Sequence, residues 1–193
     1  MKLTVNEIFY SLQGEGGRAG EASIFIRLAM CNLTCSFCDT DFAGGEEMSV
    51  DEILKIISVY PCKWIIWTGG EPTIQLKNKH LAVFRERGYK QAIETNGTRR
   101  APSLIDYIAC SPKQDYGAIK KRIPFANEIR LPVQAGEPIP DISLFPEADN
   151  YFLSPVFDAD KINFENAAYC AEFVKKHPQW RLSLQTHKLI RIK

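Results

Sequence analysis

Short hydrophobic runs rich in β-branched and aromatic residues recur along the chain and predict strands. These runs are Ser23–Leu28, Trp64–Trp67, Tyr89–Glu94, Tyr107–Cys110, Glu128–Leu131, Tyr151–Leu153 and Arg181–Leu184. Between several of them, hydrophobic positions recur every three to four residues and predict helices at Val50–Val59, Leu76–Arg87 and Phe164–Lys176. Strands that alternate with helices indicate a parallel sheet covered by helices.

Two ways of closing such a sheet fit the length of the chain. A complete eight-fold barrel typically needs about 250 residues, whereas this chain has 193. A doubly wound open sheet and an incomplete barrel both remain. No internal repeat interrupts the pattern, and the proline-rich segment Pro132–Pro146 is typical of a surface loop, so we expect one domain spanning residues 1–193.

Polar and glycine-containing clusters follow six of the predicted strands. In chain order they are CNLTCSFCDTD, TGGEP, TNGT, SPK, SPV and QTHK. Ligands bind beyond the carboxyl ends of parallel strands in both candidate folds. The six clusters therefore predict one shared binding face.

Charge and composition exclude several classes of partner. The chain carries 24 Lys plus Arg against 23 Asp plus Glu, a net charge of +1, and its basic residues form only short runs of two or three, such as Arg99-Arg100 and Lys175-Lys176. That balance is not typical of a nucleic-acid-binding protein. The chain has no run of about 18 apolar residues, and its first residues lack the apolar core of a secretory signal. We therefore expect a cytoplasmic protein with no nucleic-acid or membrane partner.

Three of the six cysteines fall within eight residues, at Cys31, Cys35 and Cys38. A reducing compartment keeps thiols free, so this cluster predicts a metal centre rather than disulfides. Three ligands leave one iron of a four-iron, four-sulfur cluster open for chemistry. Zinc with a distant fourth ligand, and three reduced thiols without metal, remain alternatives. The three other cysteines lie in apolar surroundings, at Cys62, Cys110 and Cys170, and are expected to be small buried side chains.

These motifs carry a specific resemblance. Cys-x-x-x-Cys-x-x-Cys with an aromatic residue, Phe37, before the last cysteine is similar to the signature of the radical S-adenosylmethionine (SAM) superfamily, and GGEP at 69–72 resembles its second motif. Further segments are LQGEG at 12–16, FIRLAMCNLTC at 25–35, CDTDFA at 38–43, ETNGT at 94–98, SPK at 111–113 and QTHK at 185–188. Together, in this order, they resemble the 7-carboxy-7-deazaguanine synthases over nearly the whole chain.

The resemblance implies a fold and an activity. We expect an α/β fold, an incomplete TIM-like barrel of about six parallel strands with helices outside. The implied reaction converts 6-carboxy-5,6,7,8-tetrahydropterin to 7-carboxy-7-deazaguanine with loss of ammonia, on the route to queuosine and other 7-deazapurines. The implied cofactors are a 4Fe-4S cluster, SAM and Mg²⁺, and the implied partners are a one-electron reductant and a second copy in a homodimer. A glycyl-radical-enzyme activase and a non-catalytic metal or electron-transfer module are the alternatives.

Arg27 can be interpreted from the residues themselves. Alternation along its strand places Ile24, Ile26 and Leu28 on one face and Phe25 with Arg27 on the other. Strands of a helix-covered parallel sheet are buried on both faces, so we expect Arg27 to point inward. A buried guanidinium needs an anion, and either a structural Asp or Glu or a substrate carboxylate satisfies it. The resemblance favours the substrate.

The resemblance also implies the other contacts, residue by residue. Substrate contacts fall on Leu12, Gln13, Gly14, Glu15, Arg27 and Thr95. SAM contacts fall on Phe37, Cys38, Asp39, Gly69, Gly70, Glu71, Gly97, Ser111, Pro112, Lys113, Gln185, Thr186, His187 and Lys188. Metal ligands are Cys31, Cys35 and Cys38 for iron and Thr40 for magnesium. Taken singly, these glycines and small polar residues are also typical of plain turns, and the lysines of solvated surface.

Overall fold

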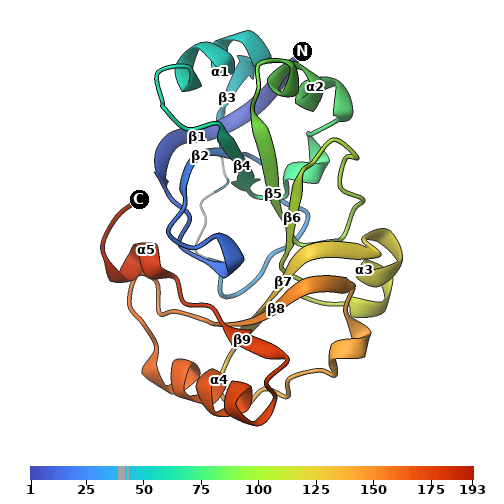
Figure 1. The fold of residues 1–193 in the computed structure, drawn as a ribbon, viewed down its shortest axis with the longest axis vertical. Helices are drawn as coiled ribbons and strands as arrows, with labels where there is room; N and C mark the ends of the chain where they lie inside the picture. The colour runs from blue at the N-terminus through green and yellow to red at the C-terminus, as the bar shows by residue number, and fades with distance from the viewer. Residues whose placement is uncertain (39–41, 43) are drawn as a thin grey trace.

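The computed structural model describes residues 1–38, 42 and 44–193. Within them, nine strands form one sheet in the order β3-β1-β2-β4-β5-β6-β7-β8-β9 (Figure 1). The strands are β1 Lys2–Leu12, β2 Ala22–Leu28, β3 Glu46–Ser49, β4 Trp64–Gly69, β5 Lys90–Thr95, β6 Tyr107–Cys110, β7 Phe125–Val133, β8 Glu147–Pro155 and β9 Trp180–Leu182. Pairing is parallel from β2 through β4 to β9, in chain order. The predicted incomplete barrel is confirmed, and all seven predicted strands belong to its parallel part.

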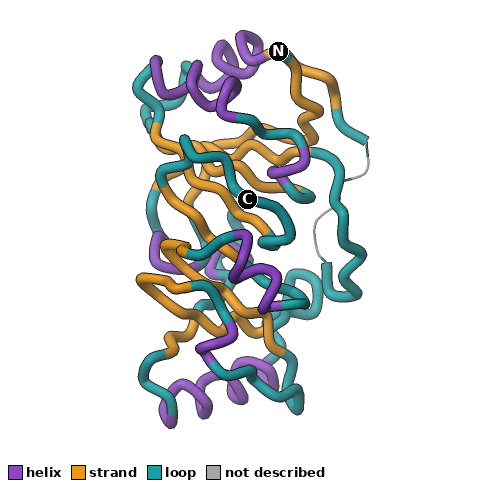
Figure 2. Tube along the Cα trace, turned by 90° about the vertical axis from the view of Figure 1, so that its right-hand side faces the viewer, coloured by secondary structure: helices purple, strands orange, loops and turns teal. Residues whose placement is uncertain are grey.

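Five helices are described, in connections of the sheet or after its last strand. They are α1 Val50–Ile57, α2 Asn78–Glu86, α3 Tyr116–Arg122, α4 Phe164–Lys176 and α5 Thr186–Leu189. The predicted capping box at Ser49 and Glu52 is present at the start of α1. Figure 2 shows the longer helices toward the two ends of the molecule, with the strands between them. Three of the five helices were predicted: α4 has the predicted ends, and the ends of α1 and α2 differ from the prediction by at most two residues.

Helix α3 was not predicted because its sequence, YGAIKKR, has a weak hydrophobic pattern. Among its seven residues only Ile119 is buried, and Gly117 lowers its helix propensity. The side chain of Asp115 caps the helix by accepting a hydrogen bond from the amide of Ala118 at 3.3 Å. The predicted surface loop also begins later than expected, because β7 continues through Pro132 to Val133.

Strands β1 and β3 were also missed, and each has a physical reason. β3 is a polar edge strand, EEMS, that forms by antiparallel pairing with β1. β1 does not alternate regularly, because its register against β2 shifts between Val5 and Glu7. Val5 pairs with Leu28, but Glu7, rather than Asn6, pairs with Arg27. This β-bulge turns Glu7 to the inner face that Arg27 shares, where an unbroken period of two would have turned it outward.

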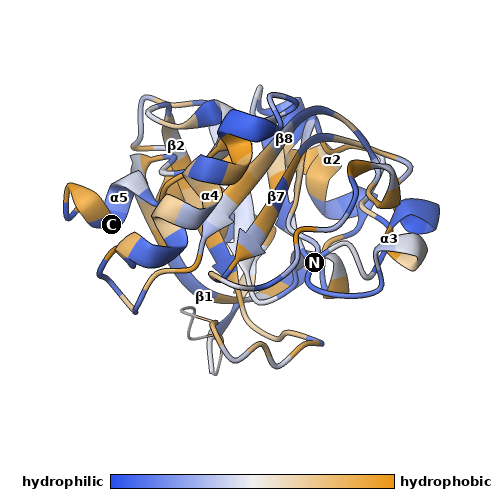
Figure 3. Ribbon diagram, turned by 90° about the horizontal axis from the view of Figure 1, so that it is seen from below, coloured by the Kyte–Doolittle hydropathy of each residue, from blue (hydrophilic) through white to orange (hydrophobic). Residues whose placement is uncertain are grey.

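The hydrophobic core lies mainly between the sheet and its helices. Trp67 on β4 is fully buried and packs edge-on against Phe84 of α2, with ring centroids 5.1 Å apart. A second core joins β7, β8, α3 and α4, and Figure 3 shows hydrophobic colour along β7. Cys110 and Cys170 are buried there as predicted, whereas Cys62 is only half-buried and its thiol donates to the carbonyl of Ala22 at 3.0 Å.

The inner face of the sheet is filled by a loop rather than by strand side chains alone. Residues 13–21, between β1 and β2, cross the barrel and include the 3₁₀ turn Gly16–Arg18. The amide of Gly17 donates to Glu128 on β7 at 2.7 Å. Buried Arg18 lies over the ring of Trp64, 3.8 Å from its centroid. We call residues 13–21 the crossing loop.

Removal of the Phe84 ring tests the core between β4 and α2. We expect Phe84→Ala to lower the free energy of unfolding by about 3–5 kcal/mol, because it leaves a cavity against Trp67. Urea denaturation followed by circular dichroism measures the change. The matched control is Val59→Ala, at a side chain that is 77% exposed, and its expected change is within about 0.5 kcal/mol. Equal losses in the two variants would contradict this description of the core.

Candidate active site

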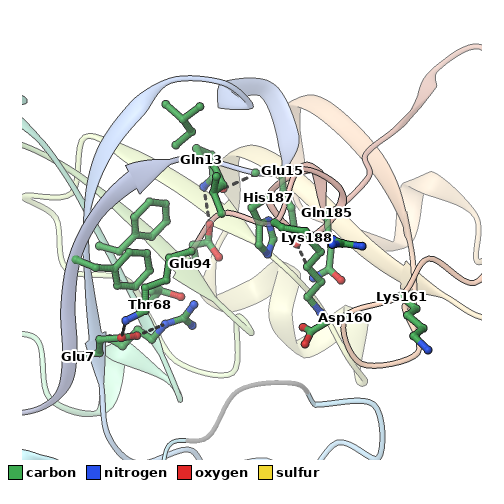
Figure 4. A pocket seen from close by; sticks show the side chains of 18 residues that line it. Glu7, Gln13, Glu15, Thr68, Glu94, Asp160, Lys161, Gln185, His187 and Lys188 are labelled. Atoms are coloured by element: carbon green, nitrogen blue, oxygen red, sulfur yellow. Dashed lines mark hydrogen bonds and ion pairs between the residues drawn. The ribbon is translucent and has the colours of Figure 1, made fainter.

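A cavity of about 790 Å³ lies at the carboxyl ends of the first parallel strands. Arg27, Thr68 and Glu94 line it from the penultimate positions of β2, β4 and β5. The crossing loop and the C-terminal segment supply the opposite walls, and Figure 4 shows Gln185, His187 and Lys188 there. Among the described residues, the lining takes Thr68 from TGGEP and three residues from QTHK, so one binding face shared by all six polar clusters stays a prediction.

Most of the predicted substrate segment reaches this cavity. The lining includes Leu12, Gln13, Gly14, Glu15 and Arg27 together with Gln185, His187 and Lys188. Thr95 does not line it: strand alternation turns Glu94 inward and Thr95 to the other face. Sequence reasoning missed Glu7, Thr68 and Glu94. Period-two alternation from Thr95 could have indicated Glu94, whereas no pattern in the sequence indicates the bulge that turns Glu7 inward.

Arg27 has a defined setting on the cavity wall. Its Nε lies 3.4 Å from Oε2 of Glu7, and its guanidinium lies 5.3 Å from the centroid of the Phe9 ring. Phe9 and Phe25 stack with centroids 4.9 Å apart and form an apolar floor beside it. The side chain of Arg27 is 32% exposed, so the guanidinium is open to the cavity. Both anions considered for Arg27 thus remain compatible: Glu7 supplies a structural carboxylate, and the partly exposed Arg27 side chain lines the cavity.

Glu7 is itself shared between two cations. Its other oxygen, Oε1, forms an ion pair with the ammonium of Lys193. The hydroxyl of Ser11 donates to the backbone carbonyl oxygen of Lys193 at 2.5 Å, so β1 holds the end of the described chain beside the cavity. Figure 1 shows the C-terminus on the same side of the molecule as β1 and β2.

A buried charge network lies behind the cavity and was not predicted. Arg130 on β7, 3% exposed, contacts Glu15 at 2.7 Å, Glu94 at 2.8 Å and Glu128 at 3.0 Å. Burial alone would raise the pKa of the Glu94 carboxyl, but the charge and hydrogen bond of Arg130 and a hydrogen bond from Gln13 outweigh it. The pKa of Glu94 is therefore held below its usual value.

The network also fixes the two loops that line the cavity. The amide of Gln13 donates to Glu94 and that of Gln185 donates to Glu15, each at 2.8 Å. The backbone amide and hydroxyl of Thr186 both donate to the carbonyl of Gly14, at 3.0 and 2.7 Å. A Cβ on Gly14 would lie 1.9 Å from Nδ1 of His187, so glycine is required at this contact. The motifs LQGEG and QTHK thus pack against each other, although 170 residues separate Glu15 from Gln185.

The loop with the three cysteines is positioned by the predicted glycine pair. The amides of Gly70 and Glu71 donate to the carbonyls of Leu28 and Met30, at 3.0 and 2.8 Å. A Cβ at Gly69 would lie 2.2 Å from the oxygen of Leu28, and one at Gly70 would lie 2.0 Å from that of Met30. Gly69 also has φ +109°, a conformation that favours glycine. The GGEP motif therefore packs against the backbone that leads into Cys31.

Glu71 is buried away from both the cavity and solvent. Its Oε1 accepts hydrogen bonds from the amide and hydroxyl of Thr73 and from the hydroxyl of Thr95, and its Oε2 accepts one from the amide of Asn96. It is 0% exposed. In this arrangement the carboxylate organises the turns after β4 and β5, and the predicted contact of Glu71 with SAM stays a prediction. Gly97 directly follows Asn96 in the turn after β5, and a Cβ at Gly97 would lie 2.9 Å from the sulfur of Cys110.

The predicted SPK segment faces the cysteine loop. Ser111 donates to the carbonyl of Arg130 and accepts from Lys113, both at 2.8 Å, and Pro112 is buried. The Lys113 ammonium lies 5.4 Å from the ring centroid of Phe37. Burial lowers the pKa of Lys113, while the nearby Cys35 thiol acts in the opposite direction. The predicted residues Asp39 and Thr40 lie outside the described residues.

The thiols of Cys31, Cys35 and Cys38 interact electrostatically, but in the described residues they are not arranged as a complete metal site. Burial raises the pKa of Cys35; Lys113 opposes that rise, and Cys38 and Cys31 add to it. Across residues 1–38, 42 and 44–193, no group of three or more His, Cys, Asp or Glu side chains is arranged to hold a metal ion. In the same ranges, no helix is long and apolar enough to cross a membrane.

Comparison with known proteins assigns these features to a family. Residues 26–136 match the model of the Radical SAM superfamily. The chain is 44% identical over 193 residues to 7-carboxy-7-deazaguanine synthase of Bacteroides thetaiotaomicron, covering 100% of each protein. It is also 44% identical to the Haemophilus influenzae protein of that name, over 98% of this chain and 94% of the other. The chain belongs to the 7-carboxy-7-deazaguanine synthase family. The crystal structure of QueE from Escherichia coli matches with a TM-score of 0.74 and 25% identity, covering 97% of this chain and 95% of that one.

Membership of the radical SAM superfamily implies a 4Fe-4S cluster and SAM, and the donor set fits them. Three soft thiols on one eight-residue loop suit iron, and with only three cysteines in the loop one iron is left for a further ligand. The thiols interact electrostatically with one another, and Phe37 and Lys113 lie beside them. In this synthase-family chain the cysteine loop begins four residues after Arg27, which lines the cavity.

The lowered pKa of Glu94 predicts a pH dependence of stability. A carboxyl whose folded-state pKa is lowered stabilises the fold above its ordinary pKa of about 4.3, and this contribution is lost as pH falls through the folded-state value. We expect Glu94→Gln to lower the free energy of unfolding by about 1–3 kcal/mol at pH 7. The variant should also lose less stability than the parent between pH 7 and pH 3. Urea titrations across that range measure both, with exposed Glu86→Gln as the control; parallel pH profiles of parent and Glu94→Gln would refute the prediction.

Proposed function

We propose that this chain converts 6-carboxy-5,6,7,8-tetrahydropterin to 7-carboxy-7-deazaguanine with loss of ammonia, for the biosynthesis of queuosine and related 7-deazapurines. The observation that carries the proposal is the cavity of about 790 Å³ beside the cysteine loop, with the Arg27 guanidinium open to it. Full-length relatives named 7-carboxy-7-deazaguanine synthase support the same product. They favour it over the glycyl-radical-enzyme activase and the non-catalytic metal module.

Arg27 would bind the carboxylate of the substrate. Glu7 holds Nε of Arg27 from one side and Phe9 lies against the guanidinium, so the two terminal nitrogens can grip both oxygens of a carboxylate. The stacked rings of Phe9 and Phe25 offer an apolar surface to a planar pterin. Arg27 thus fixes one end of the substrate and the aromatic floor fixes its plane.

The crossing loop would hydrogen-bond to the other edge of the pterin. Leu12 to Glu15 present backbone groups and the side chains of Gln13 and Glu15 to the cavity. Their positions are held by Glu94, Arg130 and Gln185, so the polar groups are oriented before substrate arrives. Thr95, which the family resemblance assigns to the substrate, would act from behind this wall through the turn that it shares with Glu71.

Cys31, Cys35 and Cys38 would hold the cluster, and Phe37, Cys38, Gly69, Gly70, Gly97 and the segments Ser111–Lys113 and Gln185–Lys188 would hold SAM. When bound, these cofactors supply a one-electron cleavage that yields a 5'-deoxyadenosyl radical for hydrogen abstraction. The protein's own contribution is to keep SAM and substrate adjacent and to exclude water, because the crossing loop and the C-terminal segment cover the cavity from two sides.

Further parts of the proposal rest on the family resemblance. Mg²⁺ would bind Thr40 and substrate oxygens, in keeping with its preference for hard oxygen ligands, and Asp39 would contact SAM. The chain would act as a single domain, in the cytoplasm, as a homodimer that receives electrons from a reductant. Unpaired edges at β3 and β9 of the described sheet give a physical motive for assembly.

Reconstitution tests the reaction. The protein is loaded anaerobically with iron and sulfide and incubated with SAM, dithionite, Mg²⁺ and 6-carboxytetrahydropterin, and mass spectrometry follows the product. We expect 7-carboxy-7-deazaguanine from the parent and from Cys62→Ala, and neither iron incorporation nor product from Cys35→Ala. Formation of 5'-deoxyadenosine without the deazapurine would show that the substrate is wrong. Absence of both 5'-deoxyadenosine and the deazapurine from an iron-loaded parent would refute the proposed enzymatic activity.

Substitution of Arg27 tests carboxylate recognition. Loss of a charge-assisted contact worth about 1.5–3 kcal/mol raises KM by about 10- to 100-fold, and we expect this for Arg27→Gln. Arg27→Lys should restore little, because an ammonium lacks the planar fork. Steady-state kinetics with varied substrate measures KM, and Lys161→Gln, which removes another cation from the cavity lining, is the matched control. An unchanged KM in Arg27→Gln would overturn the assignment.

A further inference from the structure

The crossing loop has two parts with different surroundings. Gln13, Gly14 and Glu15 line the substrate cavity, and Figure 4 shows the side chains of Gln13 and Glu15 there. The residues that follow, Gly16–Arg18, form the 3₁₀ turn and are not part of the lining. A hydrogen bond from the amide of Gln13 to the carbonyl of Glu21, at 2.8 Å, closes the loop at its base. The conformation of the turn therefore affects the part that lines the cavity.

The 3₁₀ turn needs its surroundings to hold one conformation. Two of its three residues are glycines, which lose more backbone freedom on folding than any other residue. Gly16 has φ +68°, and a Cβ there would lie 2.2 Å from the carboxylate of Glu128, so glycine is required. The amide of Gly16 donates to the hydroxyl of Ser183 at 2.8 Å, and that of Gly17 donates to Glu128 at 2.7 Å. The remaining contact comes from the side chain of Arg18.

The side chain of Arg18 is buried against aromatic rings. It is 8% exposed, and its guanidinium carbon lies 3.8 Å from the ring centroid of Trp64 and 5.7 Å from that of Tyr107. Its Nη1 is buried and has no hydrogen-bond partner within residues 1–38, 42 and 44–193. Its Nε and Nη2 lie 2.9 and 2.8 Å from the carboxylate of Glu21. Glu21 belongs to the same loop, so the contact that attaches this side chain to the sheet is the stacking on Trp64.

The two rings place this attachment away from the strand ends that line the cavity. Trp64 and Tyr107 are the first residues of β4 and β6, so Arg18 lies toward the amino ends of these parallel strands. A guanidinium that stacks on an indole out of water is held more strongly than one in solvent. The crossing loop thus has a second anchor, in addition to the ion pair of Glu15 with Arg130.

We propose that Arg18 is a positioning residue for substrate binding, which acts through the crossing loop and does not itself touch the substrate. Its stacking on Trp64 holds the loop in the conformation that presents Gln13 and Glu15 to the pterin. This role rests on the proposed function. When only a fraction of the molecules has the loop in the competent conformation, the apparent affinity for substrate falls by that fraction. Loss of the anchor therefore weakens substrate binding, whereas saturating substrate selects the competent conformation again.

Steady-state kinetics of Arg18→Leu tests the proposal, because leucine keeps an apolar contact with the ring and loses the cation. We expect KM for 6-carboxytetrahydropterin to rise about 10-fold, with kcat within about twofold of the parent. A merely structural role would instead reduce the amount of folded enzyme, which lowers kcat and leaves KM unchanged. Arg18→Lys should recover part of the loss, because an ammonium also binds the face of a ring but does not stack on it.

Lys90→Gln is the matched control. The Lys90 ammonium lies 5.5 Å from the centroid of the same Trp64 ring, but Lys90 is exposed on β5 and lies outside the crossing loop. This variant should leave KM unchanged. Phe84→Ala, which destabilises the core between β4 and α2, should also leave KM unchanged in the folded protein. Equal KM in Arg18→Leu and the parent, or an equal rise in Lys90→Gln, would overturn the proposal.

A second variant and a second measurement cover poor folding of Arg18→Leu. Trp64→Leu removes the other side of the contact and should raise KM by a similar factor, and in the double variant the two effects should not add, because both changes remove one contact. Hydrogen exchange followed by mass spectrometry needs no turnover: peptides from the crossing loop should exchange at least about 10-fold faster in each single variant, and peptides from α4 at the parent rate. Unchanged exchange in the loop would refute the anchor. Absence of deazapurine from the parent would instead refute the proposed function.

Discussion

The buried guanidinium of Arg130 is the interaction on which the site depends. It meets carboxylates from the crossing loop, from β5 and from its own strand, at 2.7 to 3.0 Å. Three carboxylates around one cation would repel one another without it, and the crossing loop would lose the ion pair between Glu15 and the far half of the sheet. The network therefore joins the two halves of an open barrel through charge, where a complete barrel would join them through strand pairing. Through Glu15 and Gln185 the same network extends to the C-terminal segment that covers the cavity.

Much of the parallel part of the fold followed from the sequence, because buried strands and amphipathic helices have periodic patterns. All seven predicted strands are present, and the interior position of Arg27 follows from alternation with Phe25. The elements that were missed lack such a pattern. β3 is polar and exists through its pairing with β1, and α3 buries a single residue of its own. The local sequence encodes neither β3 nor α3 strongly, so tertiary contacts determine that these elements form.

The candidate site shows the same division. The motifs LQGEG, QTHK and the cysteine loop were recognisable, and the first two do line one cavity. Glu7 was not predictable, because a one-residue bulge reverses the face on which it lies. Arg130 and Glu128 were hidden for another reason: in the run EIRLPV they look like the polar positions of a half-exposed strand, yet they are 3% and 2% exposed. Their burial is stable only because the loop that pairs with them comes from more than 100 residues earlier.

The contact between the glycine pair of β4 and the end of β2 has a consequence for how such enzymes vary. Main chain touches main chain there, at Gly69 and Gly70 against Leu28 and Met30, with no side chain between them. The span between Arg27, which faces the substrate cavity, and Cys31, which begins the cysteine loop, is thus set by peptide geometry alone. Side chains elsewhere in the cavity can be exchanged without altering that span, so substrate preference and radical generation are free to diverge independently on one scaffold.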